Sequence, residues 1–424
     1  MASPALAMLR GRNSPALIVL LLLALFVGLT QLGQVATRQR IPMVNPCDDV
    51  SVDFREVYLA ALYLRIGWNP SEVQRCVYPP LPAQINVPVT YLPYDVVKYL
   101  VPPSLLIAVL AALLLLHRVF TPSSLPADLI FTLTTLGTLS LSYPFRFLFD
   151  RGNLDGFVML LAALGLRWLS SAGFLAGLMF GLAAAVKVYP ALLALALLAG
   201  RRWRPLASMA ALLFVLFELS MALWLYFGQE RVFDRGEQFR LGENGSLAVT
   251  FTYLEWLAPR ALGREVPEIV HASPSTLAQP FYLGLLSLMV WRDLRERNLE
   301  RRQLCAEVML YFPFLVAIPQ LAYQYELNWL ITMLPAVGWL ASRSRDRTQQ
   351  ALLWLIVTGV ALGQFHAVAA QRLLDSVAPY VVPGFGLLLV IVVVVALRWH
   401  EVRRDGGLRA GLDRLRARMP LRGR

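Results

Sequence analysis

A carboxylate and several cations stand at positions in this otherwise apolar chain where they could take part in catalysis. Asp53 opens the stretch "SVDFREVYLAALYLRIGWNP", residues 51–70, which follows an apolar run long enough to cross a bilayer. A carboxylate at a lipid–water boundary can serve as a general base that takes a proton from a hydroxyl group. A cation such as Arg151 or Lys187 can stabilise a departing phosphate. These residue types favour group transfer from a lipid phosphate.

Each of these residues also has a purely structural interpretation. Asp53 is a favoured residue at a helix N-cap, and Lys187 can extend its side chain to the outer headgroups. Arg146 and Arg151, in "YPFRFLFDRGNLDG", are typical of interfacial anchors beside aromatic residues. Lys187 nevertheless lies beside a helix break before Pro190, which favours a functional role for an ionisable group inside an apolar segment.

Further polar side chains stand at the ends of apolar segments that the charge pattern places outside. They occur in "RGNLDG", "RLGENGSL" and "AYQYELNW", and comprise Asn153, Asn244, Ser246, Gln324, Tyr325 and Glu326. The triplet "NGS" is also a formal glycosylation sequon, which is a frequent chance match. Because these side chains and Asp53 map to one face of the membrane, we expect a single site there.

The stretch from residue 51 to 70 has helical periodicity. Its apolar residues recur at helical spacing and share one face, whereas Asp53 and Glu56 are expected on the other; the apolar set is Phe54, Val57, Tyr58, Ala61 and Leu62. The pattern predicts an amphipathic external helix that lies along the membrane. The proline-rich "CVYPPLPAQINVPV" that follows is expected to be extended and stiff.

Composition places the whole chain in a membrane. Of the 424 residues, 57% are hydrophobic and 16% charged, with a mean hydropathy of +0.57, whereas soluble domains carry about a quarter charged residues. The net charge of +12 does not indicate nucleic-acid binding, because its arginines cluster between apolar segments, as the positive-inside rule expects of cytoplasmic loops. The clusters are 201–204, 292–302, 343–347 and the tail 398–424.

The apolar segments predict an all-α polytopic protein with about 12 transmembrane helices. One kinked crossing over "AGLMFGLAAAVKVYPALLALALLAG" would put residues 201–204 outside, so we count two short helices there. Residues 1–424 then form a single integral membrane domain with both termini cytoplasmic. It carries external loops at 37–98 and 228–275 and a basic tail at 399–424. The expected spans are 16–36, 99–117, 127–144, 154–169, 172–187, 189–200, 206–227, 276–291, 304–322, 327–342, 351–369 and 379–398.

The three cysteines and four histidines limit the possible disulfides and metal sites. Cys47 and Cys76 both fall in the first external loop, where an oxidising exterior allows a disulfide, and the sequence leaves their pairing open. Cys305 lies in an apolar span and is expected to be inert. No zinc, Walker, GxGxxG or GxSxG motif occurs, so we predict no metal site and no cofactor, while metal dependence stays open.

The chain resembles the polyprenyl-phosphate-sugar-dependent glycosyltransferases of the C-type superfamily. Within it, the resemblance is to the bacterial integral-membrane family that includes the α-1,2-mannosyltransferases of phosphatidylinositol mannoside assembly. The most distinctive of the matching pieces is the glycine-rich span that ends in Lys-x-x-Pro, "AGLMFGLAAAVKVYP". In family order the pieces are "VDFREVYLAALYL", "YPPL", "RGNLDGFVMLLAALGL", "AGLMFGLAAAVKVYPALLALALL" ahead of "RRWRP", "ENGSL" and "YELNWLITMLPAVGWL".

This resemblance implies a mechanism and a location. Asp53 would be the general base in an inverting transfer of a hexose from a polyprenyl-phosphate donor to a glycolipid or glycan hydroxyl. Lys187, Arg146 or Arg151 would balance the charge of the departing polyprenyl phosphate. The substrate-binding residues would be Tyr58, Asn153, Asn244, Ser246, Gln324, Tyr325 and Glu326. The enzyme would lie in a bacterial plasma membrane, among membrane lipids, with its active site facing outside.

Two departures from the family pattern leave the substrates open. The family often has a glutamine-containing variant where this chain reads "RGN", and a histidine in the segment that here reads "YQYELNW". Gln324, Tyr325 or Glu326 would have to replace that histidine, or its role is absent. The identity of the sugar and of the acceptor is therefore not predicted.

A secondary transporter or flippase for lipid-linked sugars is the alternative function. Transporters place ionisable groups near the membrane midplane, and Glu218, in the middle of an expected span, fits that pattern as a proton-relay acid or as a group bonded to a neighbouring helix. The other candidates crowd the outer face, which favours the transferase.

Overall fold

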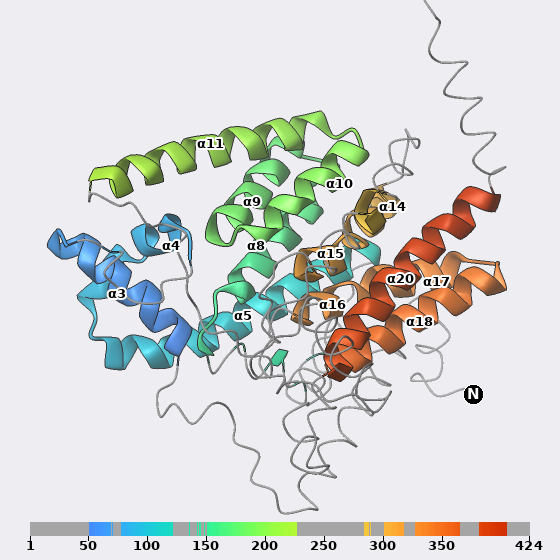
Figure 1. Ribbon diagram of the computed structural model, residues 1–424, viewed down its shortest axis with the longest axis horizontal. Coiled ribbons are helices and arrows are strands. Elements are labelled where there is room, and N and C mark those ends of the chain that lie inside the picture. Colours follow the sequence, from blue (N-terminus) through green and yellow to red (C-terminus); the bar gives the residue numbers. More distant parts are fainter. Residues whose placement is uncertain are drawn as a thin grey trace, which may run out of the picture.

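The computed structural model describes the chain in several stretches. These are residues 51–68, 70, 78–121, 135, 142, 144–145, 148, 151–226, 284–287, 289, 301–317, 327–364 and 381–404, with the side chains of α11 described to residue 216. Every regular element within these stretches is a helix (Figure 1). The expected all-α class is confirmed for the part of the chain that the structure describes.

The helices fall into two groups along the chain. The first group is α3 (Val52–Ile66), α4 (Pro80–Ile85), the 3₁₀ turn η2 (Val87–Tyr91), α5 (Tyr94–Phe120), α8 (Asp155–Trp168), α9 (Gly173–Val186), the 3₁₀ turn η3 (Tyr189–Leu192), α10 (Leu193–Ala199) and α11 (Trp203–Tyr226). The second group is α14 (Arg301–Met309), α15 (Phe312–Ala317), α16 (Asn328–Thr332), α17 (Leu334–Arg343), α18 (Arg347–Gly363) and α20 (Val381–Arg404).

Small residues allow neighbouring helices to approach closely. In the first group α5 packs on α8, α8 on α9 and α9 on α11, while α18 packs on α20 in the second. A Cβ atom at Gly177 of α9 would lie 2.1 Å from the carbonyl oxygen of Pro205, and one at Gly386 of α20 would lie 2.5 Å from the backbone nitrogen of Gly363. Close backbone approach at small residues is typical of helix packing in membranes.

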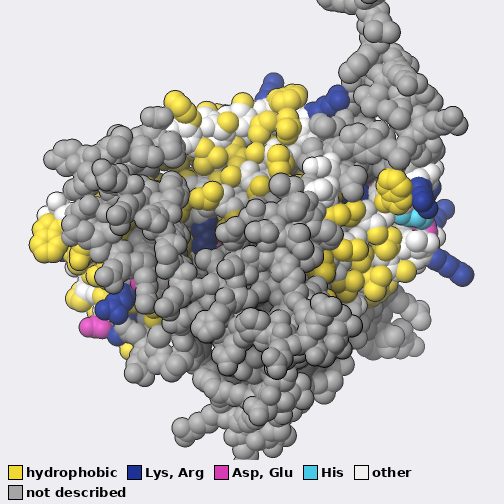
Figure 2. Space-filling model, viewed as in Figure 1, with side chains coloured by type: hydrophobic (Ala, Val, Ile, Leu, Met, Phe, Trp, Pro, Cys, Tyr) yellow, Lys and Arg dark blue, Asp and Glu magenta, His cyan; other side chains and the backbone are white. Residues whose placement is uncertain are grey.

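The apolar helices support a membrane protein. Two of the described helices, Tyr94–Phe120 and Val382–Glu401, are long and apolar enough to cross a bilayer, and Gly173–Val186, Tyr189–Ala199 and Trp203–Leu216 are shorter apolar helices. Large apolar side chains remain exposed on or beside these helices, and Figure 2 shows hydrophobic side chains gathered over the region of α11 and over that of α18 and α20. The exposed set includes Ile107, Phe174, Val188, Trp203 and Phe214. The count of twelve spans stays a prediction, because 16–36 and most of 127–144 and 276–291 lie outside the described residues.

Prolines move several boundaries away from those expected. The proline-rich stretch 76–89 was expected to be extended, but its residues 80–85 form α4 and its residues 87–89 begin η2, so that prediction is wrong. Proline is favoured at the first helical position, because its φ is already helical and the N–H that it lacks would have no partner there. Pro80 begins α4 in this way. The expected span 304–322 breaks after α14 at residues 310–311, just before Pro313. In the stretch 172–200, α9 ends at Val186 and η3 begins at Tyr189, so the predicted break at Lys187 is confirmed.

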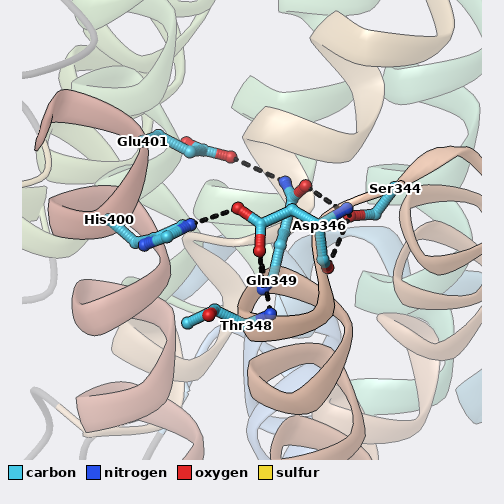
Figure 3. A network of polar contacts seen from close by, with 6 residues as sticks. All are labelled: Ser344, Asp346, Thr348, Gln349, His400 and Glu401. Carbon is cyan, nitrogen blue, oxygen red and sulfur yellow. Dashed lines mark hydrogen bonds and ion pairs between the residues drawn. The ribbon is translucent and has the colours of Figure 1, made fainter. Parts of the chain in front are cut away.

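A polar network joins the start of α18 to the end of α20 (Figure 3). Asp346 is the N-cap of α18 and accepts hydrogen bonds from the backbone N–H groups of Thr348 at 2.8 Å and Gln349 at 3.4 Å. Its other carboxylate oxygen lies 2.5 Å from Nε2 of His400. Gln349 also donates to Glu401 at 3.3 Å. The two helices are therefore tied at this end by side chains as well as by their apolar packing.

Candidate active site

The candidate site begins at a turn that packs against the start of α3. Gly152, between Arg151 and Asn153, has a φ of 64°, in the left-handed region that favours glycine. A Cβ atom there would lie 2.7 Å from Cβ of Ser51 and 2.9 Å from its Cα. Ser51 is itself held in place, because its hydroxyl donates to the carbonyl of Lys98 at 2.9 Å. Glycine is thus required for the turn to approach α3.

The turn binds both oxygens of the Asp53 carboxylate. Nε of Arg151 donates to Oδ1 at 2.7 Å, and Nδ2 of Asn153 donates to Oδ2 at 2.8 Å. Asp53 is 9% exposed, so these two partners replace most of the water around it. Two residues that flank one glycine therefore hold a buried carboxylate in a single orientation.

This geometry tests the interpretation of Asp53 as a helix cap, while its role as a base stays a prediction. The N-cap of α3 is Ser51, and no side chain caps the helix there. Asp53 lies within the first turn and bonds to Arg151 and Asn153, so the interpretation of Asp53 as a helix cap is wrong. Its expected place on a polar face with Glu56 is also wrong, because the side chain is buried beside the apolar residues of α3. Of these, Phe54, Val57, Tyr58 and Ala61 are buried as expected and Leu62 is partly buried.

A second carboxylate connects this turn to Lys187. The Asn153 side-chain oxygen accepts a hydrogen bond from the backbone N–H of Asp155 at 3.1 Å. Oδ1 of Asp155 lies 3.1 Å from Nζ of Lys187 and accepts the hydroxyl of Tyr189 at 2.6 Å. Asp155 is completely buried and the Lys187 side chain is 11% exposed. Lys187 is thus held by an ion pair rather than extended into solvent.

Aromatic side chains surround the ammonium group of Lys187. Nζ lies 5.6 Å from the ring centroid of Tyr78 and 5.7 Å from that of Tyr189, within range of cation–π attraction. The Tyr189 hydroxyl accepts a hydrogen bond from Nε1 of Trp329 at 2.8 Å, and the two rings meet edge to face. Trp329 belongs to α16, so the second group of helices contributes to the site.

Four of the predicted site residues belong to one connected group, and several contributors were missed. The connected group holds Asp53, Arg151, Asn153 and Lys187. The residues to which the sequence analysis assigned no role are Asp155, Tyr189, Tyr78 and Trp329. Asp155 follows Asn153 by two residues and Tyr189 follows Lys187 by two, so proximity along the chain was an available signal for both. Nothing in the sequence connects Trp329 to Tyr189.

Tyr58 has a different environment from the one expected. Its hydroxyl donates to the carbonyl of Leu92 at 2.7 Å, and its ring centroid lies 5.3 Å from that of Tyr94. These contacts fasten α3 to the chain that leads into α5, and a substrate-binding role for Tyr58 remains a prediction. The other predicted residues lie outside the described part of the chain: Arg146, Asn244, Ser246, Gln324, Tyr325, Glu326, Cys47 and Cys76.

The described residues hold no group of three or more His, Cys, Asp or Glu side chains that could bind a metal ion. Cys305 is a buried free thiol whose Sγ lies 3.4 Å from the carbonyl oxygen of Leu166. The arrangement of Asp53, Arg151, Asn153 and Lys187 offers acid–base and electrostatic chemistry. A carboxylate has about four lone-pair sites, so Asp53 can accept a further hydrogen bond beside those from Arg151 and Asn153.

Comparison with known proteins establishes the family. Glycosyltransferase family 87 matches residues 77–319, which is more than half of the chain. The chain belongs to glycosyltransferase family 87. The matched range of this glycosyltransferase contains Arg151, Asn153, Asp155 and Lys187, while Asp53 precedes it. The enzyme class expected from the sequence is confirmed.

Individual relatives support the expected resemblance. A polyprenol-phosphate-mannose-dependent α-(1-2)-phosphatidylinositol pentamannoside mannosyltransferase of Mycolicibacterium smegmatis is 25% identical over 343 residues, covering 78% of this chain and 77% of the relative. The Mycobacterium tuberculosis protein of the same name is 22% identical over 329 residues, covering 76% of this chain and 72% of the relative. An α-(1->3)-arabinofuranosyltransferase of M. tuberculosis is 31% identical over 174 residues, or 38% of this chain and 39% of the relative. No solved structure matches the family 87 chain.

Proposed function

We propose that this family 87 glycosyltransferase moves a mannose-like hexose from a polyprenyl-phosphate donor to a hydroxyl group of a lipid or glycan at the outer face of the membrane. Membership of the family supports the reaction class. The two mannosyltransferase relatives, whose names specify a polyprenol-phosphate-mannose donor and a phosphatidylinositol mannoside, support the donor and the kind of acceptor.

The base in this reaction is Asp53. Its carboxylate takes the proton of the acceptor hydroxyl while the hydroxyl oxygen forms a bond to the anomeric carbon of the sugar. The bond from that carbon to the phosphate oxygen breaks, and its electron pair leaves with polyprenyl phosphate. Attack on the face opposite the leaving group inverts the anomeric configuration. Arg151 and Asn153 orient the carboxylate so that its position does not change during the reaction.

The leaving phosphate is stabilised by Lys187 and Arg151. A lysine ammonium acts as a point charge toward phosphate, and an arginine guanidinium presents a planar set of donors. Both cations belong to the connected group that contains Asp53, so the base and the charges for the leaving group lie on one rigid set of contacts. This connection, from Asp53 through Asn153 and Asp155 to Lys187, is the observation that carries the proposal.

The outward orientation of the site rests on the arginine pattern. Arg343, Arg345 and Arg347 flank the connection between α17 and α18, and Arg403 and Arg404 end α20. The contact of Asp346 with His400 brings these arginine-rich ends together. The positive-inside rule assigns such an end to the cytoplasm. That rule supports the expected cytoplasmic C-terminus, and the outward-facing site is part of the same proposal.

A transfer assay with purified protein tests the proposal. The protein is incubated with radiolabelled polyprenyl-phosphate mannose and membrane lipid acceptors. A parallel reaction contains radiolabelled polyprenyl-phosphate arabinofuranose in place of the mannose donor. We expect mannose to appear on the lipid with the wild-type protein and not with Asp53→Asn. Asp95→Asn is the matched control, because Asp95 is an exposed carboxylate of α5. Movement of intact donor across proteoliposomes without transfer would instead establish the flippase alternative.

A further inference from the structure

We infer that Asp155 is a positioning residue that fixes the Lys187 ammonium group for the donor phosphate, without itself touching the substrate. This inference rests on the proposed function of Lys187 as a cation for the leaving group. Asp155 is the first residue of α8 and comes from a different helix than Lys187, which follows the end of α9. Their contact therefore holds a break in the membrane segment against a neighbouring helix.

The bonding of Asp155 is directed at Lys187 and at the tyrosine beside it. Oδ1 receives both the ammonium group and the Tyr189 hydroxyl, whereas Oδ2 is buried without a hydrogen-bond partner among the described residues. A buried carboxylate is costly unless it is paired with a charge. The pair with Lys187 supplies that charge, so the carboxylate and the ammonium group depend on each other.

A role as a helix cap does not explain this carboxylate. The N-cap of α8 is Leu154, and no side chain caps that helix end. The dipole of α8 favours a negative charge at Asp155, but it gives no reason for Oδ1 to face the chain break at Lys187. The ion pair with Lys187 explains the orientation of the Asp155 side chain.

Lys187 needs such a partner to have a defined position. Its side chain is a flexible four-carbon stem, and its backbone is extended, with φ −141° and ψ 134°. The rings of Tyr78 and Tyr189 attract the ammonium group, but ring faces tolerate a range of positions. Asp155 supplies the directional contact at 3.1 Å, and Trp329 limits the movement of Tyr189 through its indole N–H.

The two ends of the site depend on different parts of Asp155. Its backbone N–H bonds to the Asn153 side chain that orients Asp53, while its carboxylate bonds to Lys187. A side-chain substitution at Asp155 leaves the backbone N–H in place. The inference therefore predicts a loss on the donor side of the reaction and no change on the acceptor side.

Kinetics of the isosteric Asp155→Asn variant test this. Loss of a charge-assisted contact predicts a rise in the KM for the polyprenyl-phosphate sugar of about tenfold to a hundredfold, with an unchanged acceptor KM. Lys187→Met should show the same split with a loss at least as large, and the double variant should be no worse than Lys187→Met, since without the lysine Asp155 has nothing to position. Tyr189→Phe keeps the packing ring and should raise the donor KM less. A wild-type donor KM in Asp155→Asn, or a double variant whose loss is the product of the single losses, overturns the inference.

A binding measurement separates this inference from the proposed function. Polyprenyl phosphate alone should raise the melting temperature of the purified wild-type protein and raise it less in Asp155→Asn, while Asp95→Asn should behave as wild type. If the wild-type protein transfers no sugar, the proposed function fails, but the binding result still decides the role of Asp155. An equal shift in wild type and Asp155→Asn, or no shift in the wild type, contradicts it.

Discussion

Arg151 and Asp53 form a partly buried ion pair, with Nε of Arg151 2.7 Å from Oδ1 of Asp53. The two residues are 98 positions apart in the chain. The pair joins the first described helix to the turn before α8, and it gives the proposed base a fixed orientation. A general base works only if its lone pair faces the proton that it removes. The arginine thus serves the carboxylate as well as the departing phosphate.

Arg151→Ala is expected to lower kcat by about tenfold to a hundredfold, because it removes a charge-assisted hydrogen bond from a buried carboxylate. Arg151→Lys keeps the charge but not the planar donors, so its kcat should fall between those of wild type and Arg151→Ala. Arg65→Ala is the control: Arg65 is an exposed residue of α3 that donates to the carbonyl of Thr90. A wild-type kcat in Arg151→Ala would show that Asp53 does not need this partner.

Gly152 and Gly67 provide a matched pair for the turn. Both have positive φ, but a Cβ atom at Gly152 meets Ser51, whereas nothing lies within 4 Å of one at Gly67. Gly67→Ala should cost the backbone strain alone, about 1 kcal/mol of unfolding free energy. Gly152→Ala should cost about 1–3 kcal/mol more through overlap with Ser51 and should also reduce transfer. Thermal unfolding in detergent measures both, and equal losses would contradict the close approach of the turn to α3.

The contact between Asp346 and His400 predicts an acid sensitivity where α18 begins and α20 ends. The hydrogen bond with His400, followed by the backbone N–H groups of Thr348 and Gln349, holds the pKa of Asp346 below its ordinary value of 3.8, against the opposing effect of burial. A carboxyl whose pKa is lowered on folding stabilises the protein above its unfolded pKa. That stabilisation is lost as the pH falls through the folded pKa.

Melting temperatures between pH 5 and pH 3 check this for wild type and Asp346→Asn. The wild-type protein should lose its advantage over Asp346→Asn as the pH falls below 3.8, the ordinary pKa of this carboxyl group. His400→Gln should reduce the same difference, since it removes the partner that contributes most to the lowered pKa. If the difference between wild type and Asp346→Asn is constant across this range, the contact does not act as the structure indicates.

Sequence reasoning succeeded where one short stretch determines its own structure. The bounds of α8 and α9 lie within a few residues of those expected, because continuous apolar runs with clear ends define them. The break at Lys187 follows from Pro190 alone. The helix after Asp53 was predicted from the spacing of its apolar residues. In each case the deciding residues are neighbours in the chain.

Sequence reasoning failed where the position of a side chain depends on partners that are far away in the chain. Asp53 was assigned to a polar face because its partners Arg151 and Asn153 are about a hundred residues away and cannot be seen from the periodicity of α3. The hydrogen bond of Trp329 to Tyr189 joins two helices with no shared motif. Pro80 was taken as a sign of extended chain, although proline also begins helices, and the choice depended on the packing of α4 against α3.

The most direct test of the account is the rate of mannose transfer by Asp53→Asn at saturating donor and acceptor. The substitution preserves the size of the side chain and leaves Arg151 and Asn153 in place, but it removes the proton acceptor. Since general bases contribute about 10²–10⁴-fold to rate, we expect the variant to lose at least about a hundredfold in kcat while Asp95→Asn keeps the wild-type value. A folded Asp53→Asn protein that transfers mannose at the wild-type rate would contradict the central claim.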